Sequence, residues 1–526
     1  MKYIITYVLI FLNSFNYLIA VTQDTDGTAF VTSFLWFKKG NSNNVKISLH
    51  LFNNDAYKAN SASINYWSAA DNKYIQKPII LDARGYLEFP LKYEDVIIDD
   101  FDVTKETVLI KDRRVFIYTQ YSAKVVSRIF DLTTGIGDSE MVPTITMAQQ
   151  SYLVKLPKPN PGAFQIIHLL TSGDDAKVTV IHDINGRQQP VYSLVVSKTV
   201  GSDQPIIIIP ADLNDHSVSI YSDTNIHVVG AVTCVDLEST RGFGLGTPTS
   251  ICDYATMFFH PIPSFDCTTA LNGNGDRRMI TSRFTKSVYI SPPKSNTCES
   301  SLPISVYNTA TPSTMGNMIL LNQYVASTLT LAPHDQQGTQ SKYTFTPWAR
   351  FGGERSAVFE NGDQLVSSFI HYIPETSQYL NGDIRFVTFT PNSYLEIYCD
   401  FGIQLSAFLL DAEKIKPTII IEEATFSFFN KLYKYWIIKI EKTGPHYLSE
   451  FSSQTYIAFV SGKNVANMDG SYGYIAGYNR NNISTISSVG GTDKPPVTTT
   501  KSAGTVIESI LTIVFAFVFA RFNALD

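Results

Sequence analysis

A cluster of carboxylates near residue 100 is the first feature that could do chemistry. Glu94, Asp95, Asp99, Asp100 and Asp102 fall within nine residues. Extracellular calcium sites use clustered carboxylates and backbone carbonyls, so Asp95, Asp99, Asp100 and Asp102 are candidate calcium ligands. The cluster lacks the glycine and the fixed spacing of a calcium loop, and residues 96–98 in its middle are apolar. The sequence therefore favours a short strand with solvated ends over a metal site.

Five cysteines permit a second kind of chemistry. In a secreted chain nearby cysteines are oxidised to disulfides. We expect Cys234 to pair with Cys252, which closes a short loop and stabilises the fold by about 3 kcal/mol. Cys267 and Cys298 form the next pair, on either side of a loop-rich region. Cys399 follows the alternating residues 395–398, so we expect it to be a buried free thiol.

Motifs for nucleophilic, metal and phosphate chemistry are missing from the sequence. No two of the nine histidines have the i, i+4 spacing of a helical zinc site, and there is neither a C-x-x-C nor a G-x-S-x-G motif. His182 and His227 lie in predicted strands and are expected to be ordinary core or surface histidines. Residues 242–246 are glycine-rich but lack the Gly-Lys-Ser and helix of a phosphate loop. We predict no catalytic residue and no cofactor.

The elements that must position these residues are strands. Between residues 21 and 481 the chain shows short alternating or fully apolar runs bounded by Gly, Pro, Asn and Asp, which is the strand pattern. We therefore predict an all-β fold. One recurring unit is interpreted as a hairpin. Its three copies pair residues 30–37 with 45–49, 164–170 with 177–181, and 287–290 with 304–307.

A second recurring unit is a short strand, a turn and a longer strand. Its copies are residues 107–110 with 115–118, 217–220 with 226–230, 356–359 with 365–372, and 446–448 with 455–460. Recurrence of both units in one order favours an internal repeat over chance similarity among strands. We predict four tandem antiparallel β-sandwich-like repeats, at residues 24–125, 150–255, 256–375 and 376–481. The third repeat has the longest loops.

Both ends of the chain carry targeting patterns. Residues 1–20 have the positive start, apolar stretch and small residue of a cleaved secretory signal peptide. Small residues including Gly490 and Gly491, a polar spacer and the apolar tail 505–526 form a signal for a glycosylphosphatidylinositol (GPI) anchor. A single transmembrane helix is the alternative, although Glu508 is costly at membrane depth. Residues 482–504 are expected to be a polar stalk, and Asn482 is a glycosylation acceptor.

Composition excludes some classes of function. Lys and Arg number 41 against 47 for Asp and Glu, so the chain lacks the positive footprint of a nucleic-acid binder. Apolar residues make up 44% and charged residues 17%, which excludes a disordered chain. The sequence predicts a globular protein on the extracellular face of the plasma membrane.

Five segments are spread over the chain: Asp26-Gly27-Thr28-Ala29-Phe30, Ser222-Asp223, Ala407-Phe408-Leu409-Leu410-Asp411, Gly444-Pro445-His446-Tyr447-Leu448, and Ser471-Tyr472-Gly473-Tyr474-Ile475-Ala476-Gly477. Together they resemble the IgGFc-binding protein N-terminal domain family over most of residues 26–480. The family's usual Asp-Gly is here Asp411-Ala412, which leaves the turn at that position open. The resemblance implies an extracellular, mucin-associated or surface protein with a binding role, and brings no catalytic residue with it.

The sequence thus favours a non-enzymatic cell-surface binding or adhesion protein with glycoprotein, mucin or microbial ligands. Two alternatives remain open. The first is a secreted carbohydrate-active enzyme, which needs two carboxyl groups about 5–9.5 Å apart. The second is a structural coat protein that self-associates through exposed strand edges.

Overall fold

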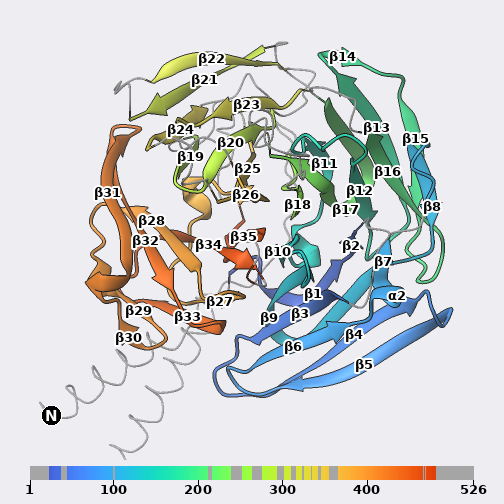
Figure 1. Cartoon of the computed structure of the whole chain (residues 1–526), viewed down its shortest axis with the longest axis horizontal. Coiled ribbons are helices and arrows are strands. Elements are labelled where there is room, and N and C mark those ends of the chain that lie inside the picture. The colour runs from blue at the N-terminus through green and yellow to red at the C-terminus, as the bar shows by residue number, and fades with distance from the viewer. Residues whose placement is uncertain are drawn as a thin grey trace, which may run out of the picture. The chain divides into compact units, whose positions relative to one another are not determined.

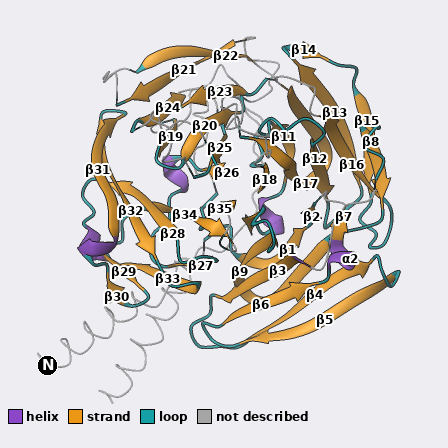
Figure 2. Ribbon diagram, in the orientation of Figure 1, coloured by secondary structure: helices purple, strands orange, loops and turns teal. Residues whose placement is uncertain are grey.

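The computed structural model describes residues 23–36, 44–98, 101–210, 216–237, 252–262, 275–292, 301–309, 316–322, 325–332, 334–341, 345–354, 365–465, 467 and 470–480. The predicted signal peptide, stalk and tail lie outside these residues, as do Asp99, Asp100, residues 242–246, Cys267, Cys298, Asn482, Gly490 and Gly491. The described chain is built almost entirely of strands in antiparallel sheets, which confirms the all-β prediction (Figure 2). All described residues belong to one compact unit.

Four repeats of one topology follow each other along the described residues (Figure 1). The first contains β1 (Gly27–Thr32), β3 (Val45–Asn53), β4 (Asn60–Ser68), β5 (Lys73–Leu81), β6 (Tyr86–Leu91), β9 (Val115–Asp131) and β10 (Gly137–Val142). The second contains β11 (Gln149–Val154), β12 (Phe164–Leu170), β13 (Ala176–Ile184), β15 (Tyr192–Val196), β16 (Gln204–Pro210), β17 (His216–Asp236) and β18 (Cys252–Phe258).

The other two repeats split the long sixth strand in two. The third contains β19 (Asp276–Thr281), β20 (Thr285–Ile290), β21 (Ser301–Asn308), β22 (Asn317–Asn322), β23 (Ser327–Thr330), β24 (Gln336–Ser341), β25 (Trp348–Gly352) and β26 (Phe369–Ile373). The fourth contains β27 (Ile384–Thr388), β28 (Ser393–Asp400), β29 (Phe408–Leu410), β30 (Glu413–Lys414), β32 (Lys431–Ile440), β33 (Gly444–Glu450), β34 (Tyr456–Val465) and β35 (Gly470–Ile475).

Several short elements and one longer strand, β31 (Ile420–Phe428), are additions to this scheme. The short elements are β2 (Phe34–Leu35) and β7 (Ile97–Ile98), which form a parallel pair, β8 (Thr107–Ile110), β14 (Arg187–Gln188), the helix α2 (Tyr93–Val96), and the 3-10 turns Ile145–Met147, Thr376–Gln378, Leu405–Ala407 and Pro417–Ile419.

Each repeat consists of two sheets that we name by position. The hub sheet contains the last strand of the repeat, and the flank sheet contains the first. The hub sheets run β6-β3-β9-β10, β16-β12-β17-β18, β23-β20-β25-β26 and β32-β28-β34-β35. The flank sheets run β5-β4-β9-β1, β15-β13-β17-β11, β22-β21-β24-β19 and β30-β29-β33-β27. In the first two repeats β9 and β17 cross from one sheet to the other.

The two kinds of apolar run in the sequence correspond to the two kinds of sheet. The central strands of the hub sheets are buried on both faces, and β12 and β26 are buried at every position, whereas the edge strands β6 and β23 are partly exposed. Flank strands such as β15 alternate, because one of their faces meets solvent. A continuous apolar run is therefore typical of a hub strand and an alternating run of a flank strand.

The last strands of the four repeats, which we call the hub strands, lie against one another. β10 contacts β18 and β35, and β26 contacts the same two strands, so the contacts form a closed cycle (Figure 1). One hydrophobic cluster joins Val126 of the first repeat to Tyr474 of the fourth through residues of the second and third. The repeats thus share a core.

The two ends of the described chain meet. The N–H of Thr25 donates to the carbonyl of Tyr478, 3.3 Å away, and the N–H of Arg480 donates to the carboxylate of Asp24 at 2.7 Å. The Lys124 ammonium forms a buried ion pair with Asp26 (3.1 Å) and donates to Gln23 at 2.7 Å and to the carbonyl of Ala476. These bonds join the first repeat to the end of the fourth.

The predicted hairpins are wrong in all three copies, although the strands themselves are correct. β12 pairs with β16 and β17, whereas β13 pairs with β14, β15 and another part of β17. The same holds for β20 and β21, and β1 does not pair with β3. Consecutive strands cross between the two sheets of a sandwich, and strand patterns do not report such a crossing.

The second predicted unit is also corrected. Residues 217–220 and 226–230 belong to one strand, β17, and no turn separates them. β8 pairs with β16 of the following repeat, and β33 and β34 lie in different sheets. Residues 356–359 lie outside the described residues. The expected repeat limits at 125 and 255 fall inside β9 and β18, because each repeat ends with its hub strand.

Candidate functional site

The hub strands carry two buried aspartates that bind the backbone of neighbouring repeats. Asp253, on β18, is 1% exposed. Its carboxylate accepts N–H donors from Tyr254 (2.8 Å) in its own repeat, from Gly137 (3.4 Å) in the first, Ser368 (2.7 Å) in the third and Ser471 (3.3 Å) in the fourth. One carboxyl group thus holds all four repeats together.

Asp138, on β10, makes a similar set of bonds. It accepts the N–H groups of Ser139 (2.8 Å), of Thr256 (3.1 Å) in the second repeat and of Gly473 (3.2 Å) in the fourth. Burial raises the pKa of Asp138 well above its usual value, and burial raises that of Asp253 to about 8 while its N–H donors oppose the rise. Both carboxyl groups are occupied by backbone donors, so the arrangement fits a structural junction better than acid–base catalysis.

Glu140 is the third buried carboxyl of this region and has fewer partners. Its Oε1 accepts the Ser127 hydroxyl at 3.4 Å, and among the described residues its Oε2 has no hydrogen-bond partner. Burial raises the pKa of Glu140 to about 8, which favours the neutral acid at neutral pH.

A hydroxyl, an imidazole and a carboxylate are aligned in the fourth repeat. The Thr388 Oγ1 lies 2.9 Å from the His446 Nε2, and the His446 Nδ1 lies 2.8 Å from the Asp411 carboxylate. This is the order of a nucleophile, base and orienting acid. Nε2 also lies 2.8 Å from the carbonyl of Lys442, an acceptor that competes for its N–H, and Thr388 is 1% exposed. The geometry fits a clamp between β27 and β33.

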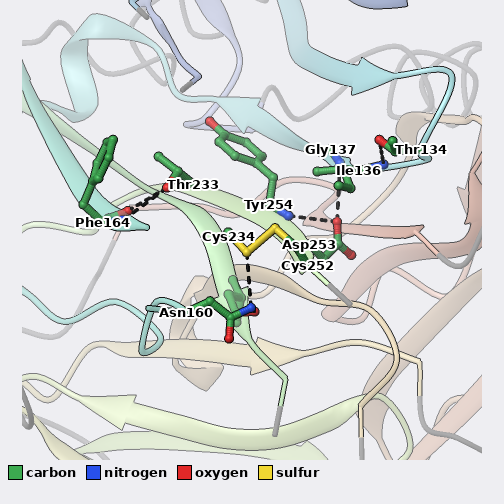
Figure 3. The surroundings of a disulfide bond; sticks show 11 residues. Thr134, Ile136, Gly137, Asn160, Phe164, Thr233, Cys234, Cys252, Asp253 and Tyr254 are labelled. Carbon is green, nitrogen blue, oxygen red and sulfur yellow. Dashed lines mark hydrogen bonds between the residues drawn. A yellow bond between two sulfur atoms is a disulfide. The ribbon is translucent and has the colours of Figure 1, made fainter. Parts of the chain in front are cut away.

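The predicted disulfide is present. Cys234 on β17 is bonded to Cys252 at the start of β18, with 5.0 Å between their Cα atoms, which confirms that pairing (Figure 3). The bond lies next to Asp253, so it fixes a hub strand beside the junction (Figure 3). Cys399 is buried and unpaired, as predicted, and burial raises the pKa of its thiol to about 12.

The two calcium candidates that the structure describes are committed to other partners. Asp95, on α2, is buried and accepts the hydroxyl of Ser68. Asp102 accepts the N–H and the hydroxyl of Thr104 in an exposed turn, at 3.1 and 2.6 Å. In the part of the chain that the structure describes, no three His, Cys, Asp or Glu side chains converge as metal ligands.

The histidines singled out in strands are core residues. The His227 ring bonds to the carbonyl of Thr144 at 3.2 Å. His182 lies 2.9 Å from the His216 ring and 2.8 Å from the Tyr192 hydroxyl, and burial lowers the pKa of His182 to about 4. Both rings are used for packing and hydrogen bonding.

Sequence reasoning missed the hub aspartates, although the chain carries a signal for them. Asp138, Asp253 and Ser471 are the second residues of β10, β18 and β35, and Ser368 comes immediately before β26. They are 115, 115 and 103 residues apart, close to the predicted repeat length of roughly 110. A small polar residue before an apolar strand at this interval marks the junction.

No family model matches the chain, and no curated protein matches it either. Several solved structures match the chain weakly, among them two adhesion proteins. One is a tetra-tandem repeat in the extending region of a large adhesion protein, with 9% identity, a TM-score of 0.10, and coverage of 86% of this chain and 99% of that one. The other contains the N-terminal eight Ig domains of Down Syndrome Cell Adhesion Molecule isoform 1.30.30, with 10% identity and a TM-score of 0.10.

The second match covers 87% of this chain and 50% of that one, so this chain spans about half its length. At a TM-score of 0.10 neither likeness carries an argument about function. None of the helices in the described ranges is long and apolar enough to cross a membrane.

Proposed function

We propose that this protein is a non-enzymatic binding or adhesion protein of the cell surface. Its repeats form a scaffold that presents outward sheet faces and loops to glycoprotein, mucin or microbial ligands. The observation that carries the proposal is the use of the buried carboxyls. Asp138 and Asp253 are saturated by backbone donors of other repeats, so the polar groups of the interior hold the scaffold together. Loops and outward faces remain for recognition.

The resemblance to the IgGFc-binding protein N-terminal domain family supports the same proposal. The segments that carry it coincide with structural contacts of the scaffold. Asp26 pairs with Lys124 where the chain ends meet, the N–H of Gly473 binds Asp138, and Asp411 binds His446. Membership in that family is part of the proposal, together with secretion and a GPI anchor.

Binding of a purified fragment, residues 21–481, to cells and to immobilised mucin tests the function. Saturable binding without turnover supports the proposal. Absence of binding to every surface tested contradicts it.

The anchor is tested by treating intact cells with a phosphatidylinositol-specific phospholipase, with a GPI-anchored protein of known sensitivity as the control. Release of the full-length protein supports the GPI anchor. Retention on the cells favours the single transmembrane helix.

An enzyme is the second candidate, and the Thr388–His446–Asp411 alignment is the observation that favours it. Hydrolysis of an ester, amide or glycoside that is lost in both Thr388→Val and His446→Asn would show that the protein is an enzyme and would replace our proposal.

A coat protein is the third candidate. It is favoured by the edge strand β22, where Met318 and Leu320 are 74% and 63% exposed. Concentration-dependent assembly without a ligand would support it.

A further inference from the structure

The outward face of the first flank sheet has an unusual composition. Strand alternation turns Ile64 and Tyr66 of β4 into the core, so the odd-numbered residues of β4 and the even-numbered residues of β5 point outward. We call this surface the tyrosine face. It consists of Tyr74, Gln76, Pro78 and Ile80 on β5, Ser61, Ser63, Asn65 and Trp67 on β4, and Tyr118 on β9. None of these side chains is charged.

Strand register places the members of the tyrosine face in rows. Ser63 lies between Pro78 and Tyr118, and Trp67 lies beside Tyr74. Tyr74 and Tyr118 are 49% and 42% exposed. Burial raises the pKa of Tyr118, and the charge of Tyr74 adds to that rise. Tyr74 lies beside Trp67 and Tyr118 beside Ser63, so the two rings stand at different points along β4.

Two polar side-chain atoms of β4 lack a hydrogen-bond partner among the described residues. Asn65 is 5% exposed, and its Oδ1 accepts no hydrogen bond from any described residue. The Trp67 Nε1 is a buried donor that likewise has no acceptor within the described ranges. Both atoms have almost no solvent-accessible surface, so they belong to the interior of the sheet and lie outside the reach of a ligand on the outward face.

A loop of the second repeat closes one end of the face. The backbone of Gly201 lies so close to the Trp67 ring that an added Cβ would be 2.6 Å from a ring carbon. The N–H of Gly201 is held at 3.0 Å by the buried Asp112 carboxylate, which itself pairs with Arg114. The end of the face is thus a fixed wall.

We propose that the tyrosine face binds uncharged saccharide units of a glycan. A pyranose ring stacks its C–H face on an aromatic ring, and each of its hydroxyls both donates and accepts a hydrogen bond. Tyr74 and Tyr118 supply rings, and Gln76 and Ser63 supply polar partners. The absence of charge on the face favours neutral sugars over acidic ones and over nucleic acid. The inference rests on the proposed binding function and names its ligand class.

Tryptophan emission provides a direct measurement. The chain has four tryptophans, and Trp36, Trp348 and Trp436 are at most 2% exposed, whereas Trp67 is only half-buried. The fragment of residues 21–481 is titrated with neutral oligosaccharides released from mucin and, in parallel, with the sialylated fraction. We expect saturable change in emission with the neutral fraction, and loss of that change in Trp67→Phe. No response to the neutral oligosaccharides would overturn the proposal.

Substitutions locate the site. Tyr74→Ala and Tyr118→Ala should each weaken binding of the neutral oligosaccharides about tenfold, because each removes a stacking ring, while Tyr74→Phe keeps most of the affinity. Phe451→Ala, at an aromatic residue 59% exposed in the fourth repeat, is the matched control and should bind normally. Unfolding midpoints equal to that of the unmodified fragment establish that the variants are folded. Normal binding by both alanine variants would overturn the proposal.

A further arm separates failure of this proposal from failure of the proposed function. Deglycosylated mucin is presented alongside intact mucin. If the fragment binds both equally, its partner is a protein surface, so the saccharide proposal fails while the binding function stands. If it binds neither mucin nor cells, both proposals fail.

Discussion

At the scale of single residues, the clearest feature is the carboxylate of Asp253, which accepts four backbone N–H donors. Asn has nearly the same shape, but its amide group would point a donor at two of these N–H groups. We expect Asp253→Asn to lower the free energy of unfolding by about 1–3 kcal/mol, since two buried N–H donors lose their acceptor. Urea denaturation measures the change.

Asp203→Asn is the control for that substitution. Asp203 is half exposed and pairs with Lys111 at the surface, 2.7 Å away. Such a pair contributes at most about 1 kcal/mol, so the control should be nearly neutral. Equal effects of the two substitutions would contradict the structural role of Asp253.

The pKa of Glu140 predicts a dependence of stability on pH. Its value in the folded protein is raised from 4.5 to about 8, so the folded state binds the proton more tightly than the unfolded state. This contribution to stability is complete below pH 4.5, falls by about 1.4 kcal/mol per pH unit as the pH rises, and is lost above pH 8. Glu140→Gln is neutral at every pH. It should therefore remove the part of the pH dependence of the free energy of unfolding that comes from this one proton.

The measurement is the free energy of unfolding in urea between pH 5 and 9. Asp138 and Asp253 have pKa values raised by burial and contribute slopes of the same sign, so a residual slope is expected in the variant. A variant profile parallel to that of the unmodified protein would show that Glu140 is not the titrating group.

At the scale of elements, the turn between β29 and β30 has an unfavourable backbone conformation at two residues that carry a Cβ. Leu410 pairs with Glu413, so Asp411 and Ala412 form a two-residue hairpin turn. Their φ angles are 53° and 66°, in the left-handed region where a Cβ is unfavourable. Ala412 therefore adopts a conformation that glycine would adopt more easily.

Ala412→Gly should therefore stabilise the protein by about 1 kcal/mol, because glycine adopts a positive φ without steric cost. Ala424→Gly, in the interior of β31, is the matched control and should destabilise by about 0.5–1 kcal/mol. Thermal and urea unfolding of both variants test the sign. A loss of stability in Ala412→Gly would contradict the argument.

Glycine has a different purpose in the hub strand β35. A Cβ on Gly473 would lie 2.5 Å from the Phe369 ring of β26, so Gly473 allows the third and fourth repeats to approach each other. Gly473→Ala should cost about 1–3 kcal/mol through overpacking. Gly402→Ala is the control, because a Cβ at that position would meet nothing closer than the Gln454 side-chain oxygen, 3.8 Å away. An unchanged free energy of unfolding in Gly473→Ala would show that β26 and β35 can move apart at little energetic cost.

The strands themselves could be predicted from the sequence because alternation and apolar runs are local patterns. The disulfide could be predicted because a short loop separates Cys234 from Cys252. The partners of the strands could not, since pairing in a sandwich depends on crossings between sheets. The junction at Asp253 could not be predicted as a site either, because its donors come from residues 137, 368 and 471, which the sequence does not bring together.

At the scale of the whole described unit, the four repeats share one core, and the closing contact joins the first repeat to the fourth. Lys124 is the centre of that contact. Burial lowers the pKa of the Lys124 ammonium and raises the pKa of the Asp26 carboxyl. The attraction and the hydrogen bond between the two groups oppose both shifts and so favour their charged forms. The repeats should therefore unfold together, and the contact between the two chain ends should depend on the Lys124–Asp26 ion pair.

Lys124→Met should lower the free energy of unfolding by about 3–5 kcal/mol, since it leaves the buried Asp26 carboxylate without its cation. The double variant Lys124→Met/Asp26→Asn should recover part of the loss, because no unpaired charge remains. Lys46→Met, at a surface pair with Glu88, is the control and should cost at most about 1 kcal/mol.

Hydrogen exchange reports directly on the contact between the two chain ends, because the N–H groups of Thr25 and Tyr478 each bond across it. Both amides should exchange faster in Lys124→Met, whereas the amides of β12, deep in the second repeat, should keep their protection relative to global unfolding. Unchanged exchange at both ends would mean that the repeats hold together without this contact, through the hub strands alone.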